Sequence, residues 1–137
     1  MIVIDTNILI SALIKESTTR KIIIESGFEF AYPEISLIEI LKYKSYIIKK
    51  AGYSNLDFEK IFNKLLDYLN LVPLKIIESN LLEANKLIGK VDPDDIIFVA
   101  TALTLKNSII WSEDNDFLKQ SIIKTVKTKE LLNLIQR

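Results

Sequence analysis

The sequence predicts an α/β fold in which helices cover both faces of a parallel sheet. Short apolar runs, such as Ile2–Ile4 and Ile109–Trp111, alternate along the chain with segments of helical periodicity. Strands separated by helices indicate a parallel sheet, because a parallel connection needs a crossover segment. The clearest runs are apolar throughout rather than alternating, as in strands that are buried on both faces.

Each predicted strand is a short apolar run bounded by turn residues. The strands are expected at residues 2–4, 29–32, 71–72 and 109–111, and around Val126. Pro33 closes the second strand. Pro73 follows residues 71–72, which fit either a short strand or a turn.

The predicted helices have apolar side chains at helical spacing. They are expected at residues 7–15, 18–26, 34–51, 57–70, 79–88, 94–106 and 129–135. Gly27, Gly52 and Gly89 stand just after three of them, where a glycine commonly ends a helix. Asn55 or Asp57 is the expected N-cap of the helix at 57–70.

The composition indicates one folded domain over residues 1–137. The chain is 49% hydrophobic and 26% charged, and its formal net charge of +0 supplies no basic field for a long nucleic acid. The chain has no cysteine and no histidine, so catalysis would depend on carboxylates, hydroxyls, lysines or a metal. Neither a secretory leader nor an apolar run of membrane-spanning length is visible, so we expect a cytoplasmic protein without a membrane partner.

Carboxylates follow two of the predicted strands at their carboxyl ends. Asp5 comes directly after the first strand, and Asp114 and Asp116 come shortly after the strand at 109–111. Open parallel sheets bind ligands at this edge, and a charge at the end of a buried strand needs a partner or a metal. The alternative is that Asp5, Ser112, Asp114 and Asp116 only cap the segments that follow them.

Two further groups of acids lie within or before predicted helices. Glu39, in the helix expected at 34–51, is a candidate site acid. The alternative is that it is an ordinary, partly exposed helix glutamate that pairs with Lys42. The segment 92–95, Asp-Pro-Asp-Asp, is a well-formed helix start in itself, with Asp92 as the N-cap. The helix after it is apolar on nearly all sides, so we expect it to be buried, with its first acids able to face a cleft.

The aspartates are concentrated in a way that predicts a metal site. Five of the eight fall within residues 92–116. Like charges about 4 Å apart repel by about 4 kcal/mol at an effective dielectric constant near 20. A converging cluster would therefore raise carboxylate pKa values or recruit a divalent cation. A ligand set made only of oxygen atoms suits Mg²⁺ or Mn²⁺ and does not suit zinc.

The order of these acids along the chain resembles the PIN-domain family of metal-dependent ribonucleases. The matching positions are Asp5-Thr6-Asn7, Glu39, Asp95 with Ala100-Thr101-Ala102, and Ser112-Glu113-Asp114-Asn115-Asp116-Phe117. The resemblance spans essentially the whole chain. It implies a three-layer α/β/α sandwich with a central parallel sheet and an acidic pocket that holds one or two Mg²⁺ or Mn²⁺ ions.

The resemblance also implies a role for each matching residue. The principal catalytic and metal-binding acids would be Asp5, Glu39, Asp95 and Asp114. Asp116 would be an accessory metal ligand, directly or through water. The supporting side chains would be Thr6 and Asn7, which orient Asp5, and Ser112, which holds Asp114. Asp94 is adjacent to Asp95, and the spacing to the two alanines favours Asp95.

The implied activity is endoribonuclease hydrolysis of RNA, with 5′-phosphate and 3′-hydroxyl products. A bound divalent cation would make a water molecule acidic enough to attack the phosphorus. The nearest relatives resemble VapC-type toxins, which implies an antitoxin protein and a second copy of the chain, as a homodimer, among the partners. Alternatives are a non-catalytic RNA- or protein-binding module and a phosphotransferase with Asp5 as nucleophile, for which the Asn at position 7 is unfavourable.

Substrate contacts are expected on the segment after Glu39. The lysines there, chiefly Lys42 and Lys44 and then Lys49 and Lys50, would bind RNA phosphates, unless they form only a solvated helix face. Tyr43 and Tyr46 would stack on bases, although packing in the core or in a dimer is the favoured interpretation. Glu113 would weaken the approach of RNA if it pointed into the pocket.

Overall fold

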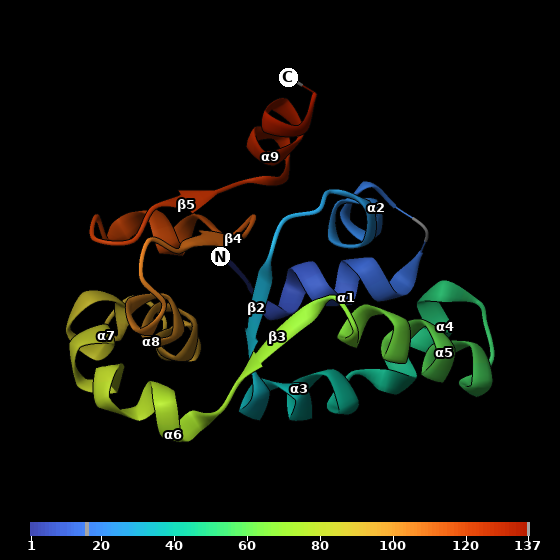
Figure 1. Cartoon of the computed structure of the whole chain (residues 1–137). Helices are drawn as coiled ribbons and strands as arrows, with labels where there is room; N and C mark the ends of the chain where they lie inside the picture. Colours follow the sequence, from blue (N-terminus) through green and yellow to red (C-terminus); the bar gives the residue numbers. More distant parts are fainter. Residues whose placement is uncertain (16, 137) are drawn as a thin grey trace.

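A parallel sheet forms the centre of the protein in the computed structural model, which describes residues 1–15 and 17–136. Within that part of the chain the sheet has five strands in the order β3-β2-β1-β4-β5, and all neighbouring pairs are parallel (Figure 1). The strands are β1 (Ile2–Ile4), β2 (Phe30–Pro33), β3 (Leu69–Val72), β4 (Ile109–Trp111) and β5 (Thr125–Val126). The predicted parallel sheet is confirmed.

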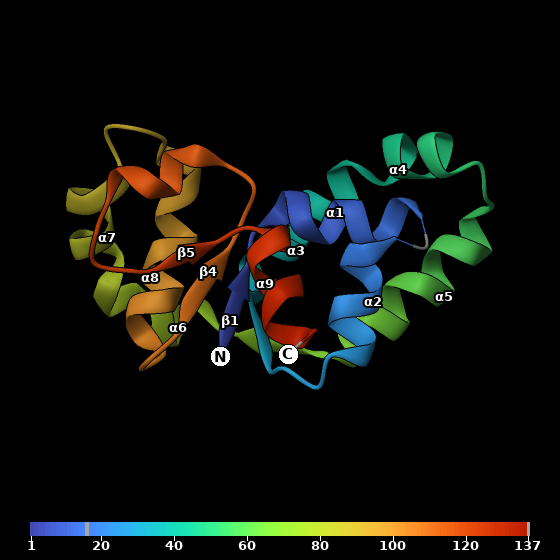
Figure 2. The ribbon, with the colours of Figure 1, turned by 90° about the horizontal axis from the view of Figure 1, so that it is seen from above.

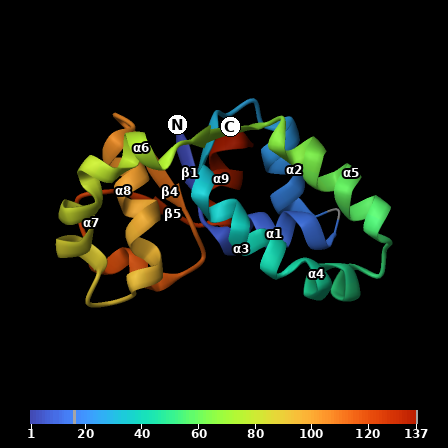
Figure 3. The ribbon, with the colours of Figure 1, turned by 90° about the horizontal axis from the view of Figure 1, so that it is seen from below.

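Helices cover both faces of the sheet (Figures 1 and 2). One face carries α6 (Leu74–Ile77), α7 (Leu81–Ile88) and α8 (Ile96–Thr104), and the other carries α1 (Thr6–Ile14), α2 (Thr18–Glu25), α5 (Asn55–Leu66) and α9 (Thr128–Ile135). Figure 3 shows α3 (Leu37–Lys42) and α4 (Lys44–Ala51) on the side of α1. Short 3-10 turns lie at Glu34–Ser36, Glu78–Asn80, Pro93–Asp95 and Asn115–Lys119. This three-layer α/β/α sandwich is the predicted architecture.

The strands and α8 form the centre of the apolar core. Phe30 and Trp111, from strands on either side of β1, are both fully buried, and their ring centroids are 5.8 Å apart. Val99 and Ala100 of α8 are also fully buried, as expected for a helix with apolar side chains on nearly all sides. Each large buried side chain contributes about 1.5–3 kcal/mol, so this core holds the strand ends in fixed positions. None of the described helices has the length and apolar character needed to cross a membrane.

The prediction of one long helix over residues 34–51 is wrong. The segment begins as a 3-10 turn, continues as α3, and breaks at Tyr43, whose backbone angles are φ −93° and ψ 5°. The Tyr43 N–H is shared between the carbonyls of Glu39 and Ile40, at 3.2 and 3.1 Å. The helix therefore tightens and stops there, and α4 continues from Lys44 with Ile47 fully buried.

Several predicted helix ends also need correction. Ser54, rather than Asn55 or Asp57, is the N-cap of α5, and Asp57 completes the capping box from the third helical position. This helix ends at Leu66, so β3 is longer than the predicted 71–72, and α6 lies between β3 and the helix expected at 79–88. Gly27 and Gly52 have the left-handed φ of +76° and +74°, whereas Gly89 ends α7 at φ −60°.

Candidate metal centre

Asp5 and Ser112 lie side by side because of the strand register. β1 and β4 are parallel, with Ile4 opposite Trp111, so the residue after each strand emerges at the same edge of the sheet. The Asp5 N–H donates to the Trp111 carbonyl at 3.3 Å and extends the ladder by one residue. The buried Ser112 hydroxyl donates to Oδ2 of Asp5. Two segments more than a hundred residues apart are thereby joined.

The Asp5 carboxylate is buried and held at both oxygens. Its Oδ1 accepts from the Ile8 N–H at 2.8 Å, which makes Asp5 the N-cap of α1, and only 5% of the residue is exposed. Burial raises the pKa of Asp5, and the hydrogen bonds from Ser112 and Ile8 oppose that shift. Asp5 therefore caps α1, which was the alternative considered for it, and it also lines a cavity at the predicted edge of the sheet.

Asp114 is hydrogen-bonded to the same serine, Ser112, through its backbone N–H. The Ser112 Oγ accepts from the Asp114 N–H at 2.9 Å, and Oδ1 of Asp114 accepts from the Asp116 N–H, also at 2.9 Å. Asp114 thus caps the 3-10 turn after β4 while its second oxygen is not used for capping. Asp116 lies 3.5 Å from the Lys119 amine through its Oδ1. Both acids are half-buried.

The segment before α8 brings in two further aspartates. Oδ1 of Asp92 accepts from the Asp94 N–H at 2.9 Å, while Asp95 is buried and Asp94 is exposed. Oδ2 of Asp95 is buried and has no hydrogen-bond partner among residues 1–15 and 17–136. Burial, followed by the charges of Asp92, Asp114, Asp5 and Asp116, raises the pKa of Asp95 to about 7. Such an arrangement stabilises a proton or a cation at this carboxyl group.

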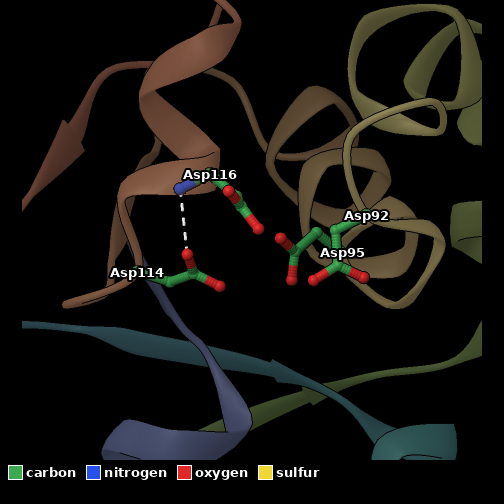
Figure 4. Close-up of side chains that lie close together, drawn as sticks. All are labelled: Asp92, Asp95, Asp114 and Asp116. Carbon is green, nitrogen blue, oxygen red and sulfur yellow. Dashed lines mark hydrogen bonds between the residues drawn. The ribbon is translucent and has the colours of Figure 1, made fainter.

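Four carboxylates converge from these two segments (Figure 4). One oxygen each from Asp92, Asp95, Asp114 and Asp116 lies within 4.8 Å of all the others. The donor set consists of oxygen atoms only, as Mg²⁺ and Mn²⁺ prefer, and the buried Asp95 Oδ2 accepts no hydrogen bond from any described residue. The residues present therefore fit a divalent cation.

The remaining predicted acids line the same cavity. This cavity has a volume of about 190 Å³, and its walls include Asp5, Glu39, Asp95 and Asp114. Glu39 is half-buried on α3. Its pKa is raised by burial and by the charge of Asp94, while Lys42 lowers it. The structure thus brings all five predicted metal-binding acids to one region, with Asp5 and Glu39 outside the tight group of four aspartates.

Thr6 and Asn7 support the site differently from the expectation. The Thr6 hydroxyl bonds to the Tyr32 hydroxyl at 2.8 Å rather than to Asp5. Because the single Tyr32 proton is donated to the Ser36 carbonyl at 3.2 Å, Thr6 is the donor in this pair. Asn7 supports Asp5 through its backbone N–H, and its exposed side chain lines the cavity.

The charged residues expected near the substrate are not all directed at the cavity. The Lys44 amine pairs with Glu59 of α5 at 2.8 Å and lies 5.2 Å from the centroid of the Phe58 ring. Lys42 is exposed and acts on Glu39 only through its charge. Glu113 accepts from the Thr128 N–H at 2.8 Å, so its carboxylate is directed to the start of α9 rather than to the four aspartates.

Sequence reasoning underestimated two residues. Asp92 was expected as an N-cap and as one of five clustered aspartates, but not as a principal metal ligand; it caps the turn and also belongs to the four-carboxylate group. The signal was its position two and three residues before Asp94 and Asp95, within the same aspartate-rich segment. Packing in the core or in a dimer was favoured over base stacking for Tyr43, and the structure excludes the core, because Tyr43 is 49% exposed at the edge of the acidic cavity.

The arrangement of the fold and the acids agrees with a comparison against known protein families. No curated protein matches the chain. A family model described as the PIN domain matches residues 3–135. The matched region contains all the acids of the cavity and the whole sheet apart from Ile2, the first residue of β1. The chain therefore belongs to the PIN-domain family.

Proposed function

We propose that this protein is a metal-dependent endoribonuclease that hydrolyses phosphodiester bonds in RNA, with residues 1–137 acting as one nuclease domain in the cytoplasm. PIN domains have a nuclease-type fold. The observation that carries the proposal is the group of four converging aspartates with a buried, unpartnered oxygen on Asp95. Such a group is costly without a cation, since like charges at about 4 Å repel by about 4 kcal/mol at an effective dielectric constant near 20.

The proposed cofactor is Mg²⁺ or Mn²⁺, held by Asp92, Asp95, Asp114 and Asp116, with Asp5 and Glu39 on the walls of the same cavity. Bound there, either ion would supply an acidified water and would offset negative charge on the phosphoryl oxygens. The chain itself contributes orientation. Ser112 holds Asp5 and Asp114 together, and the cap bonds of Ile8 and Asp116 fix one oxygen of each.

The reaction balances without a histidine base. An oxygen of water bonds to phosphorus, the bond between phosphorus and the 3′ oxygen breaks, and a proton passes to that oxygen. The products are a 5′-phosphate and a 3′-hydroxyl. The acidic cavity repels an RNA phosphate when no cation is bound, which makes activity strictly dependent on the metal.

The test is cleavage of a structured RNA pool by purified protein with Mn²⁺, with Mg²⁺ and with EDTA, beside the variant Asp5→Asn. An asparagine still accepts the Ile8 N–H as an N-cap, so the fold is expected to survive. We expect a loss of cleavage of at least about 100-fold, because the charge beside the cation is gone. Asp67→Asn, an exposed aspartate of the same chemistry, is the matched control and should cleave normally.

Two outcomes contradict this proposal. Metal-dependent cleavage retained in Asp5→Asn refutes the site. No cleavage by folded wild-type protein with any divalent metal favours a non-catalytic RNA- or protein-binding role of the fold. Circular dichroism of each variant, measured under the cleavage conditions, separates loss of activity from loss of structure.

The finer proposal is that the chain is the toxin of a toxin–antitoxin pair and forms a homodimer. In support, α3 and the turn before it expose three large apolar side chains, Ile35, Ile38 and Leu41, at 48%, 59% and 55%. A patch of this kind favours an interface with another protein. A neighbouring short reading frame for a DNA-binding antitoxin, and relief of growth arrest when both are expressed, would support the pair, whereas an isolated gene would favour RNA processing.

A further inference from the structure

A groove opens beside the acidic cavity, between α1 and α4. It has a volume of about 760 Å³ and is lined by residues that include Lys15, Tyr43, Tyr46 and Lys50. Asn7 and Tyr43 line both the groove and the acidic cavity, so the two depressions adjoin each other at these residues. A polymer strand bound in the groove would therefore pass beside the carboxylates.

The groove has the opposite charge to the cavity. Among its described lining residues, two are lysines and none is an acid, while the adjoining cavity is lined by six carboxylates: Asp5, Glu39, Asp92, Asp94, Asp95 and Asp114. Lys15 ends the first helix and Lys50 lies in the last turn of α4. Both lysines are exposed, and neither takes part in an ion pair within residues 1–15 and 17–136. They are available to bind phosphate groups on one side of the cleavage site.

The two tyrosines present free ring faces to this groove. Tyr43 is 49% and Tyr46 is 53% exposed, and neither has a ring partner or a side-chain hydrogen bond among the described residues. Tyr43, which immediately precedes α4, and Tyr46 and Lys50 of that helix follow helical spacing. They lie on the side of the helix that faces α1, next to the buried Ile47. Aromatic rings interleaved with cations are the pattern of sites that bind single-stranded nucleic acid.

We infer that this groove binds the single-stranded RNA that flanks the scissile phosphate, with bases stacked on Tyr43 and Tyr46 and phosphates bound by Lys15 and Lys50. The inference rests on the proposed nuclease function and assigns to this groove the residues that would hold the substrate strand beside the acids. Bases of an A-form duplex are stacked on one another and cannot present their faces to the tyrosines. The groove thereby selects single-stranded segments and directs them to the acids.

The test measures binding of a labelled ten-nucleotide RNA by fluorescence anisotropy, in the Asp5→Asn background with Mg²⁺ so that the strand is not cut. We expect single-stranded RNA to bind more tightly than the same sequence as a duplex. Tyr46→Ala should weaken binding about 5- to 100-fold, the range for loss of one stacked base. Affinity for RNA falls as salt rises, and Lys50→Ala should make the plot of log affinity against log salt concentration less steep by about 0.7.

Matched controls come from exposed residues of the same type elsewhere on the surface. Tyr68→Ala removes an exposed tyrosine that does not line the groove, and Lys106→Ala removes an exposed lysine that lines neither the groove nor the acidic cavity. Both should leave RNA affinity unchanged. Equal affinity for duplex and single strand, or equal effects of Tyr46→Ala and Tyr68→Ala, would overturn the inference. So would a variant that loses self-association but binds RNA normally, which would assign the groove to a second copy of the chain.

Failure of this inference is distinguishable from failure of the proposed nuclease. If wild-type protein cleaves RNA but the groove variants bind it normally, the nuclease stands and the groove inference fails. If wild-type protein cleaves nothing but the groove variants bind single strands more weakly than the controls, the groove inference stands and the protein is a binding module.

Discussion

Ser112 donates its hydroxyl hydrogen to Asp5 and connects the end of β4 to the end of β1. Its oxygen also accepts the N–H of Asp114, at 2.9 Å. One fully buried hydroxyl therefore sets the position of two acids that come from opposite ends of the chain. A hydroxyl is needed for this, because it both donates and accepts.

Ser112→Ala should lower both cleavage and stability. It leaves Oδ2 of Asp5 and the Asp114 N–H without their partner, which should cost about 1–3 kcal/mol of unfolding free energy. The loss of orientation should reduce metal-dependent cleavage about 10- to 100-fold. Ser112→Thr keeps the hydroxyl and should retain most activity. Urea unfolding and cleavage rates check this, and an Ala variant as active as the Thr variant would contradict it.

Asp92→Asn should weaken Mn²⁺ binding more than Asp94→Asn does. Asp92 contributes an oxygen to the four-carboxylate group, whereas Asp94 is exposed and lies outside that group. An asparagine at position 92 still caps the turn, so the comparison isolates the charge. Titration calorimetry with Mn²⁺ should show about a 10- to 100-fold loss of affinity for Asp92→Asn. Equal losses in the two variants would mean that only the total negative charge matters.

Stability without metal should fall as the pH rises from about 4 to about 7. The pKa of Asp95 is about 7 in the folded protein and near 3.8 when it is unperturbed, so the folded state retains a proton that the unfolded state has lost. The stabilisation that protonated Asp95 gives the folded state is fully present below the unfolded pKa, and it is lost as the pH rises through the folded pKa. The loss is on the order of 2–4 kcal/mol, since one pKa unit corresponds to about 1.4 kcal/mol.

Urea unfolding in EDTA at pH 5 and pH 8 measures this effect. Asp95→Asn should remove most of the difference between the two pH values, and Asp67→Asn, an exposed aspartate, should not. Mn²⁺ should stabilise wild-type protein at pH 8 more than at pH 5, because the cation competes with the Asp95 proton. Wild-type protein that becomes more stable in EDTA between pH 5 and pH 8 would contradict the prediction.

The sequence was sufficient for the elements that depend on strong local signals. Continuous apolar runs identified β1 and β4 to the residue, and the acids after them follow from the parallel sheet. The break at Tyr43 was not predictable, because no proline or glycine lies there to mark it. The feature that goes with the break is the burial of Ile47, which is a tertiary contact and leaves no local signal in the sequence. Helix propensity is a weak guide when tertiary contacts oppose it.

Long-range partners were the main part of the site that the sequence did not reveal. The bond between Thr6 and Tyr32 and the convergence of Asp92 with Asp116 depend on how separate elements pack. A motif identifies residue types and their order, but the same aspartate can cap a turn, bind a cation or do both. Asp5, Asp92 and Asp114 each cap a helical segment and also lie at the cavity.

Tyr32 joins the two walls of the acidic cavity, and removal of its hydroxyl should test whether that connection matters. The hydroxyl accepts from Thr6, next to Asp5, and donates to Ser36, which immediately precedes the helix of Glu39. Tyr32→Phe keeps the buried ring but leaves the Thr6 hydroxyl and the Ser36 carbonyl without this partner. We expect a loss of about 1–3 kcal/mol in unfolding free energy, measured in urea.

The same variant should weaken Mn²⁺ binding only a few-fold, because Tyr32 positions the elements that carry Asp5 and Glu39 without lining the cavity itself. Tyr68→Phe alters an exposed hydroxyl with no role in the site and should change neither quantity. Restored cleavage at lower temperature, where the weakened fold is fully populated, would identify Tyr32 as a positioning residue. A loss of cleavage as large as that of Ser112→Ala, with stability unchanged, would instead require direct contact between Tyr32 and the substrate.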